Sequence, residues 1–173
     1  MYNDFVILGP ANDPAGIRGI KDVTEAFKKL ADSQAKMVSR GDNSGTHVKE
    51  MEIWQAAGIK PNGDWYENWP DGDKGNGPTT KYANEQQAYV LMDRATYLTL
   101  KNDINLAVLV ECDPLMLNYI ALIRVNPEKF PNVNKDDALA LADFLVSDEA
   151  QDIIRTFKVD VYGEPLFFPN AQK

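Results

Sequence analysis

The stretch AKMVSRGDNSGTHVKEMEIWQAA, residues 35–57, joins a short apolar run to a polar, Gly-containing turn and then to a longer amphipathic run. Residues 35–39 have the length and apolar character of a buried strand. Residues 45–57 have helical periodicity, and Gly58 ends the pattern. The predicted helix would carry four apolar side chains on one face: Val48, Met51, Trp54 and Ala57. The stretch therefore predicts a strand, a turn and a helix, the unit from which α/β folds are built.

The same alternation continues on both sides of this stretch. Strands are predicted over 5–8, 88–92, 107–110 and 119–125, the last being the strongest strand signal in the chain. Helices are predicted over 23–32, 79–87, 96–100, 136–146 and 148–157. Residues 59–78 lack periodicity and predict a long structured loop. The order of elements predicts an α/β fold with a mainly parallel sheet flanked by helices.

Composition excludes several classes of partner. The chain has 173 residues, 44% of them hydrophobic, and a formal net charge of −8. A sequence pI near 4.6 argues against nucleic acid, because phosphate backbones need a basic face. No run approaches the roughly 20 apolar residues that span a bilayer. Only a local feature can therefore indicate what the chain binds.

Cysteine and histidine each occur once. A single Cys112 allows no internal disulfide and no thiolate cluster, and we expect it to be a buried small hydrophobe. His47, also alone, argues against a His-rich metal site and is expected to make a local hydrogen bond. Residues 1–5 have neither a basic nor an apolar region typical of a signal peptide. We therefore predict no resident metal and no cofactor.

The turn at residues 39–46 is the candidate site. Backbone N–H groups at such a strand–helix turn converge at the positive end of the helix dipole. Two glycines let the backbone approach a ligand closely, and two hydroxyls and one guanidinium add donors. This donor set fits a tetrahedral oxyanion and needs no metal. The candidate binding residues are Arg40, Ser44, Gly45 and Thr46.

Other interpretations of the same residues remain open. The turn could be an ordinary capped helix start, with Arg40 in an ion pair with Asp42 or Glu50. Arg40 and Asp42 could instead serve as the cation and base of an enzyme that handles phosphoryl or sulfuryl groups. Asp93 and Arg94, after a predicted strand, could be a catalytic acid–cation pair, but a structural ion pair or added positive potential near a cleft is favoured.

Motifs in chain order extend beyond the turn. They are YNDFVILGP at 2–10, DPAG at 13–16, SRGD at 39–42, SGTH at 44–47, AY at 88–89, DR at 93–94, TYL at 96–98, DPL at 113–115, NY at 118–119 and VNP at 125–127. Over nearly the whole chain they resemble the tungstate-binding periplasmic proteins of tungstate ABC transporters. The resemblance implies a receptor, not an enzyme, that binds tungstate or molybdate. It further implies contacts from Arg40 and Thr46 and a turn lined by Ser44 and Gly45. Around these contacts, Asp42, His47 and Arg94 are candidates for supporting roles.

Members of that family resemble type II periplasmic binding proteins, in which two α/β lobes close on the ligand. By that resemblance, residues 1–122 are the second lobe with the oxyanion loop. Residues 123–173 would form a return strand and C-terminal helices that pack on a first lobe, which is expected to be missing here. The implied partners are an ABC permease and, through the exposed lobe face, a second copy. The implied location is periplasmic or extracellular.

Two departures from the family pattern stand out. Residues 75–78 read GNGP where the family tends to have Gly-Met-Gly, and Ala95 follows Arg94 where the family usually has Gly. A third interpretation therefore stays open beside the receptor and the enzyme: a fragment that binds no oxyanion and only associates with a partner chain.

Overall fold

The computed structural model describes residues 1–171, which form two compact units. The larger unit comprises residues 4–117, and the smaller unit comprises residues 1–3 together with the chain from Asn118 onward. Within the described residues, no helix is both long and apolar enough to cross a membrane.

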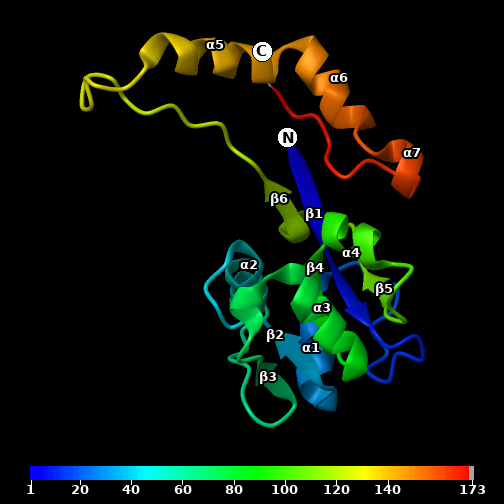
Figure 1. Ribbon diagram of the computed structural model, residues 1–173. Helices are drawn as coiled ribbons and strands as arrows, with labels where there is room; N and C mark the ends of the chain where they lie inside the picture. The colour runs from blue at the N-terminus through cyan, green and yellow to red at the C-terminus, as the bar shows by residue number, and fades with distance from the viewer. Residues whose placement is uncertain (172–173) are drawn as a thin grey trace. The chain divides into compact units, whose positions relative to one another are not determined.

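The larger unit alternates strands and helices, as Figure 1 shows. Its elements are β1 (Tyr2–Gly9), α1 (Val23–Ser33), β2 (Met37–Ser39), α2 (Gly45–Ala56), β3 (Tyr66–Asn68), η1 (Gly72–Lys74), α3 (Asn76–Glu85), β4 (Val90–Asp93), α4 (Arg94–Leu100), β5 (Ala107–Val110) and η2 (Pro114–Met116). The smaller unit contains α5 (Lys135–Val146), α6 (Asp148–Thr156) and α7 (Val159–Tyr162). Two strands belong to both units: β6 (Leu117–Tyr119) begins at the last residue of the larger unit, and the first two residues of β1 lie in the smaller unit. This mixed α/β order confirms the predicted fold class.

Strand β1 lies at the centre of the main sheet, between β4 and β5, and it also pairs with β6. It runs antiparallel to β4, with Leu8 opposite Val90, and antiparallel to β5. Parallel pairing occurs between β2 and β3, and at the bridge between Met37 and Tyr89. The expected parallel sheet is thus present only in part.

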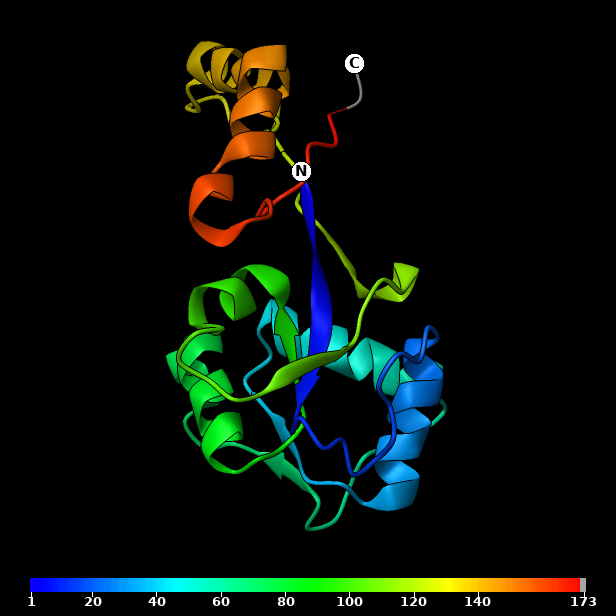
Figure 2. The same cartoon turned by 90° about the vertical axis from the view of Figure 1, so that its right-hand side faces the viewer.

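Both faces of β1 are buried. Because side chains alternate along a strand, Phe5 and Ile7 pack in one apolar cluster, whereas Val6 and Leu8 pack in another. The first cluster includes residues of α1 and α2, and the second includes Ala83 of α3. Figure 2 shows α1 and α3 on opposite sides of β1. A sheet covered on both faces explains why β1 reads as a continuous apolar run.

Three local predictions are wrong. Val48 is 48% exposed, because α2 buries the face that carries Thr46, Glu50, Ile53 and Trp54. Cys112 is exposed and has a positive φ of 68°, so it lies in the segment between β5 and η2 and not in the core. Residues 59–78 are not all loop, since they contain β3, η1 and the start of α3.

The strand predicted over 119–125 is wrong beyond Tyr119. The apolar, β-branched composition is typical of a strand, but a strand also needs a neighbour for its backbone groups. Ile120 N donates to Met1 O at 3.0 Å, and after it the chain leaves the sheet. Ile123 is 85% exposed.

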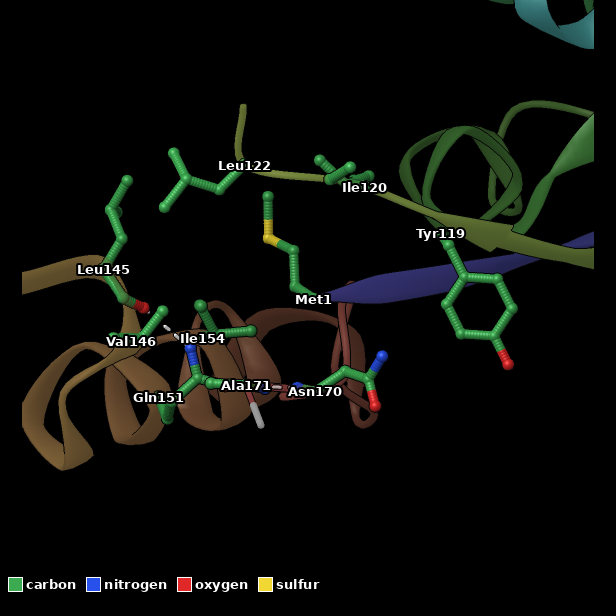
Figure 3. Close-up of a pocket in the computed structure, with 11 residues that line it drawn as sticks. Met1, Tyr119, Ile120, Leu122, Leu145, Val146, Gln151, Ile154, Asn170 and Ala171 are labelled. Carbon is green, nitrogen blue, oxygen red and sulfur yellow. Dashed lines mark hydrogen bonds between the residues drawn. The ribbon is translucent and has the colours of Figure 1, made fainter. Parts of the chain in front are cut away.

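The smaller unit is held by pairing between the two ends of the chain. Tyr2 and Phe168 exchange two backbone hydrogen bonds of 3.0 and 2.8 Å, and their rings stack at 5.2 Å. A pocket of about 470 Å³ within this unit is lined by Met1, Leu122, Leu145, Ile154 and other side chains, as Figure 3 shows. The unit also exposes many large apolar side chains: Ile120, Leu122, Ile123, Val125, Phe130, Leu139, Leu141, Phe144, Val146, Ile153, Phe157 and Val161.

A carboxyl group is buried in the core of the larger unit. Glu50 is 2% exposed, and its Oε1 accepts hydrogen bonds from Tyr66 Oη at 2.6 Å and Trp54 Nε1 at 3.2 Å. Burial raises the pKa of Glu50 to about 7, although the hydrogen bond from Tyr66 acts in the opposite direction. Burial, together with the neighbouring Glu50 charge, likewise raises the pKa of Tyr66.

Glu50 should therefore make stability depend on pH. Because folding raises its pKa from 4.5 to about 7, the native state holds this proton more tightly than the unfolded chain does. Its contribution is complete below pH 4.5 and is lost as the pH rises through 7. Glu50→Gln keeps an acceptor for both donors but cannot ionise. From pH 5 to pH 8, the free energy of unfolding of the wild type should fall by roughly 2 kcal/mol more than that of E50Q.

Urea denaturation of both proteins at the two pH values measures this difference. Glu52→Gln is the matched control, since Glu52 lies on the same helix with its side chain 50% exposed and paired with Lys49. Equal pH dependence in the wild type and E50Q would show that Glu50 does not titrate in this range.

Candidate functional site

The turn between β2 and α2 has the predicted strand–turn–helix form. Gly41 and Asn43 adopt positive φ angles of 63° and 59°, and Ser44 caps α2 by accepting a 3.4 Å hydrogen bond from His47 N. The amides of Gly45 and Thr46, at the start of α2, have no hydrogen-bond partner among the described residues. Two backbone donors therefore remain available at the positive end of this helix.

The Arg40 side chain is only 11% exposed and donates to three acceptors. Its Nη2 lies 2.5 Å from Asp42 Oδ2, and its Nε lies 3.2 Å from the carbonyl oxygen of Gly72. Its Nη1 donates to Asn76 Oδ1. The guanidinium is thus fixed between the turn and the segment that precedes α3.

Asp42 holds Arg40 from within the turn itself. Its second oxygen, Oδ1, accepts from Ser44 N at 3.1 Å. Burial raises the pKa of Asp42, but the hydrogen bonds from Ser44 and the charge of Arg40 outweigh it, so the pKa lies below its ordinary value. A carboxylate with a lowered pKa and both oxygens engaged is a poor general base. It is well suited to orienting Arg40.

Thr46 and Asn76 extend the cluster. Thr46 is 6% exposed, and its hydroxyl lies 3.1 Å from Asn76 Oδ1, the atom to which Arg40 also donates. Asn76 Nδ2 donates to Asp93 Oδ2 at 2.7 Å. Asp93 in turn caps α4 by accepting from Thr96 N at 2.8 Å. Arg40 and Thr46 therefore converge on a single acceptor position.

The structure brings together four of the residues predicted from the turn: Arg40, Asp42, Ser44 and Thr46. Gly45 has open space where a side chain would begin. His47 makes the expected local hydrogen bond, accepting from Asn43 N at 2.9 Å.

Sequence reasoning missed Asn76 and Asp93 as members of the cluster. Pro78 was an available signal, because proline favours the first turn of a helix. It would have started α3 at Asn76 and not at residue 79. Within residues 1–171, no group of three or more His, Cys, Asp or Glu side chains is placed to hold a metal ion.

Arg94 is engaged by other partners. It forms a two-pronged ion pair with Asp4 of β1, with a closest distance of 2.6 Å, and it lies 2.8 Å from Glu111. The hydrogen bonds that Arg94 donates to Asp4 outweigh desolvation and raise the pKa of Arg94 above its ordinary value. Arg94 therefore connects β1 to the segment that follows β5, which is a structural role.

A family model described as a PBP superfamily domain matches residues 1–149. The chain belongs to the PBP superfamily. The tungstate-binding protein TupA of Peptoclostridium acidaminophilum is 43% identical over 175 residues, an alignment that covers 100% of this chain and 60% of TupA. A putative ABC transporter anion-binding protein of Haloferax volcanii is 46% identical, covering 99% of this chain and 50% of that protein.

Two solved structures share the fold of this chain. The tungstate-binding protein TupA from Desulfovibrio alaskensis G20 aligns with a TM-score of 0.84 and 40% identity, covering 99% of this chain and 69% of that chain. A structure titled as the tungstate ABC transporter from Geobacter sulfurreducens aligns with a TM-score of 0.74 and 44% identity, covering 89% of this chain and 64% of that one. The PBP chain described here thus spans between half and two thirds of the length of most of these relatives.

Replacing Arg94 should test its structural role. Arg94→Met leaves Asp4 without its partner in a site where both side chains are at most 15% exposed. We expect the free energy of unfolding to fall by about 3 kcal/mol, because a mostly buried carboxylate loses its counter-ion.

Arg155→Met is the control for this measurement. It removes an exposed ion pair with Asp152 and should cost under about 1 kcal/mol. If R94M were no less stable than R155M in urea denaturation, the Asp4–Arg94 pair would not be a structural link.

Proposed function

We propose that this chain binds tungstate, or molybdate, as part of the solute receptor of an ABC importer. The observation that carries the proposal is the convergence of Arg40 and Thr46 on one acceptor position. The two amides at the start of α2 that have no partner among the described residues add further donors. A guanidinium, a hydroxyl and helix N-terminal amides form a donor set for an oxyanion. Relatives named as tungstate-binding proteins support this choice of ligand.

Each residue has a distinct proposed role. Arg40 supplies charge and Thr46 a hydroxyl donor, while Gly45 and Ser44 line the turn. Asp42 orients Arg40, and His47 stabilises the turn. Tungstate and sulfate carry the same charge, so selection between them would rest on cavity size and donor number.

We propose binding without turnover. An enzyme that handles phosphoryl or sulfuryl groups would need Asp42 as a base, and its lowered pKa and two occupied oxygens argue against that role. The relatives named as binding proteins support the same choice. No cofactor is required by this proposal.

The proposed binding depends on Arg40. Isothermal titration of the chain with tungstate should give saturable binding that Arg40→Ala weakens at least 30-fold, because a charge-assisted contact is lost. Arg18→Ala is the control with the same charge change, since Arg18 donates to the carbonyl of Ala11 on an exposed loop. Undiminished binding by R40A, or release of product from a phosphate ester, would contradict the proposal.

We further propose that residues 1–122 act as one lobe of the receptor and that residues 123–173 pack against another lobe in a longer protein. The apolar side chains exposed by the smaller unit support this, because apolar patches of this kind mark interfaces. The permease is the proposed partner of the whole receptor, with a periplasmic or extracellular location. In the isolated chain, the same patch would favour self-association.

Sedimentation velocity over a range of concentrations tests this self-association. The wild type should shift towards larger species as concentration rises, and Leu141→Lys should reduce the shift because Leu141 is 58% exposed within the patch. Val48→Lys is the control, since Val48 is a similarly exposed apolar residue on α2 of the larger unit. A wild type that stays monomeric throughout would contradict the proposal.

A further inference from the structure

Asn76 occupies the acceptor position of the proposed oxyanion site. Its Oδ1 lies 3.1 Å from Thr46 Oγ1 and accepts from Arg40 Nη1. These are the two side-chain donors that the proposed function assigns to the ligand. An amide oxygen therefore stands where an oxyanion oxygen would receive the same two hydrogen bonds.

The orientation of the Asn76 amide is determined by its neighbours. Nδ2 donates to Asp93 Oδ2 at 2.7 Å, and a carboxylate oxygen is an acceptor. Arg40 offers only donors, so the oxygen of the amide has to face it. Asp93 and Arg40 thus fix the orientation of the amide, so that its oxygen, Oδ1, points into the site.

Arg40 does not need Asn76 to keep its position. Its Nη2 still pairs with Asp42 at 2.5 Å, and its Nε still donates to Gly72 O at 3.2 Å. Asp93 Oδ2 also keeps a second donor, Thr96 Oγ1 at 2.6 Å. Loss of the Asn76 side chain would therefore free donors without removing what holds them.

We propose that Asn76 is an internal competitor for the oxyanion, whose side-chain oxygen must leave Arg40 and Thr46 before the ligand can bind. This inference rests on the proposed function, because it concerns the same donors. A neutral amide oxygen satisfies the donors of an empty site, whereas a dianion would bind the guanidinium more strongly. Asn76 would thus set the affinity of the site without contacting the ligand.

Asn76→Ala tests the competition directly. Titration with sodium tungstate should show a dissociation constant at least threefold lower for N76A than for the wild type. If Asn76 instead only held the site in shape, its removal would raise the dissociation constant for tungstate. Asn84→Ala is the control on the same helix; Asn84 Oδ1 accepts from Asn105 N, and its removal should leave the affinity for tungstate unchanged.

The possible failures can be told apart. A folded N76A with equal or weaker affinity overturns the competitor role and leaves the proposed function intact. A wild type that binds no tungstate overturns both. If N76A does not fold, Asn76→Ser and a crystal structure of the tungstate-bound wild type decide. In that structure the distance from Thr46 Oγ1 to Asn76 Oδ1 should exceed 3.5 Å, and an unchanged hydrogen bond would refute the inference.

Discussion

The anchoring of the Arg40 guanidinium is the interaction on which the site depends. Its acceptors come from the turn, from the carbonyl of Gly72 and from Asn76 at the start of α3. Only glycine fits at position 72, because a Cβ there would lie 1.9 Å from the carbonyl oxygen of Arg40. The close approach of Gly72 to the backbone of Arg40 therefore fixes the position at which the side chains of Arg40 and Thr46 converge.

The larger unit supplies a rigid frame for this contact. β1 is buried on both faces, and α2, which carries Thr46, packs through Ile53 and Trp54 against the same cluster as Phe5. Asp4, next to Phe5 in β1, adds an ion pair with Arg94. A net charge of −8 is no obstacle to binding an anion, because Arg40, Thr46 and the amides of α2 act at short range.

Much of the fold and of the turn that carries the site could be predicted from local sequence. The apolar runs of β1 and β2, the cap at Ser44 and the turn around Arg40 each follow from patterns within a few residues. Residues that act over long separations were not accessible in this way. Asn76 contacts Arg40 across 36 positions, and no local pattern reports such a contact.

The wrong predictions share a physical cause. Residues 120–125 have strand composition but no strand to pair with, and α2 turns Glu50 inward because Tyr66 and Trp54 can satisfy its carboxyl group. Composition and periodicity report the preference of a segment, whereas pairing and burial depend on what the fold places beside it. The identity of the anion likewise rests on relatives that extend beyond this chain.

The position of a bound tungsten atom would show whether Arg40 and Thr46 hold the oxyanion. Tungsten scatters X-rays anomalously, so crystals of the chain grown with sodium tungstate would locate the ligand without interpretation of its oxygens. We expect one strong anomalous peak, at a position where the oxygens of the oxyanion accept hydrogen bonds from Arg40 and Thr46. A dominant peak elsewhere, with Arg40 still bound to Asn76, would contradict it.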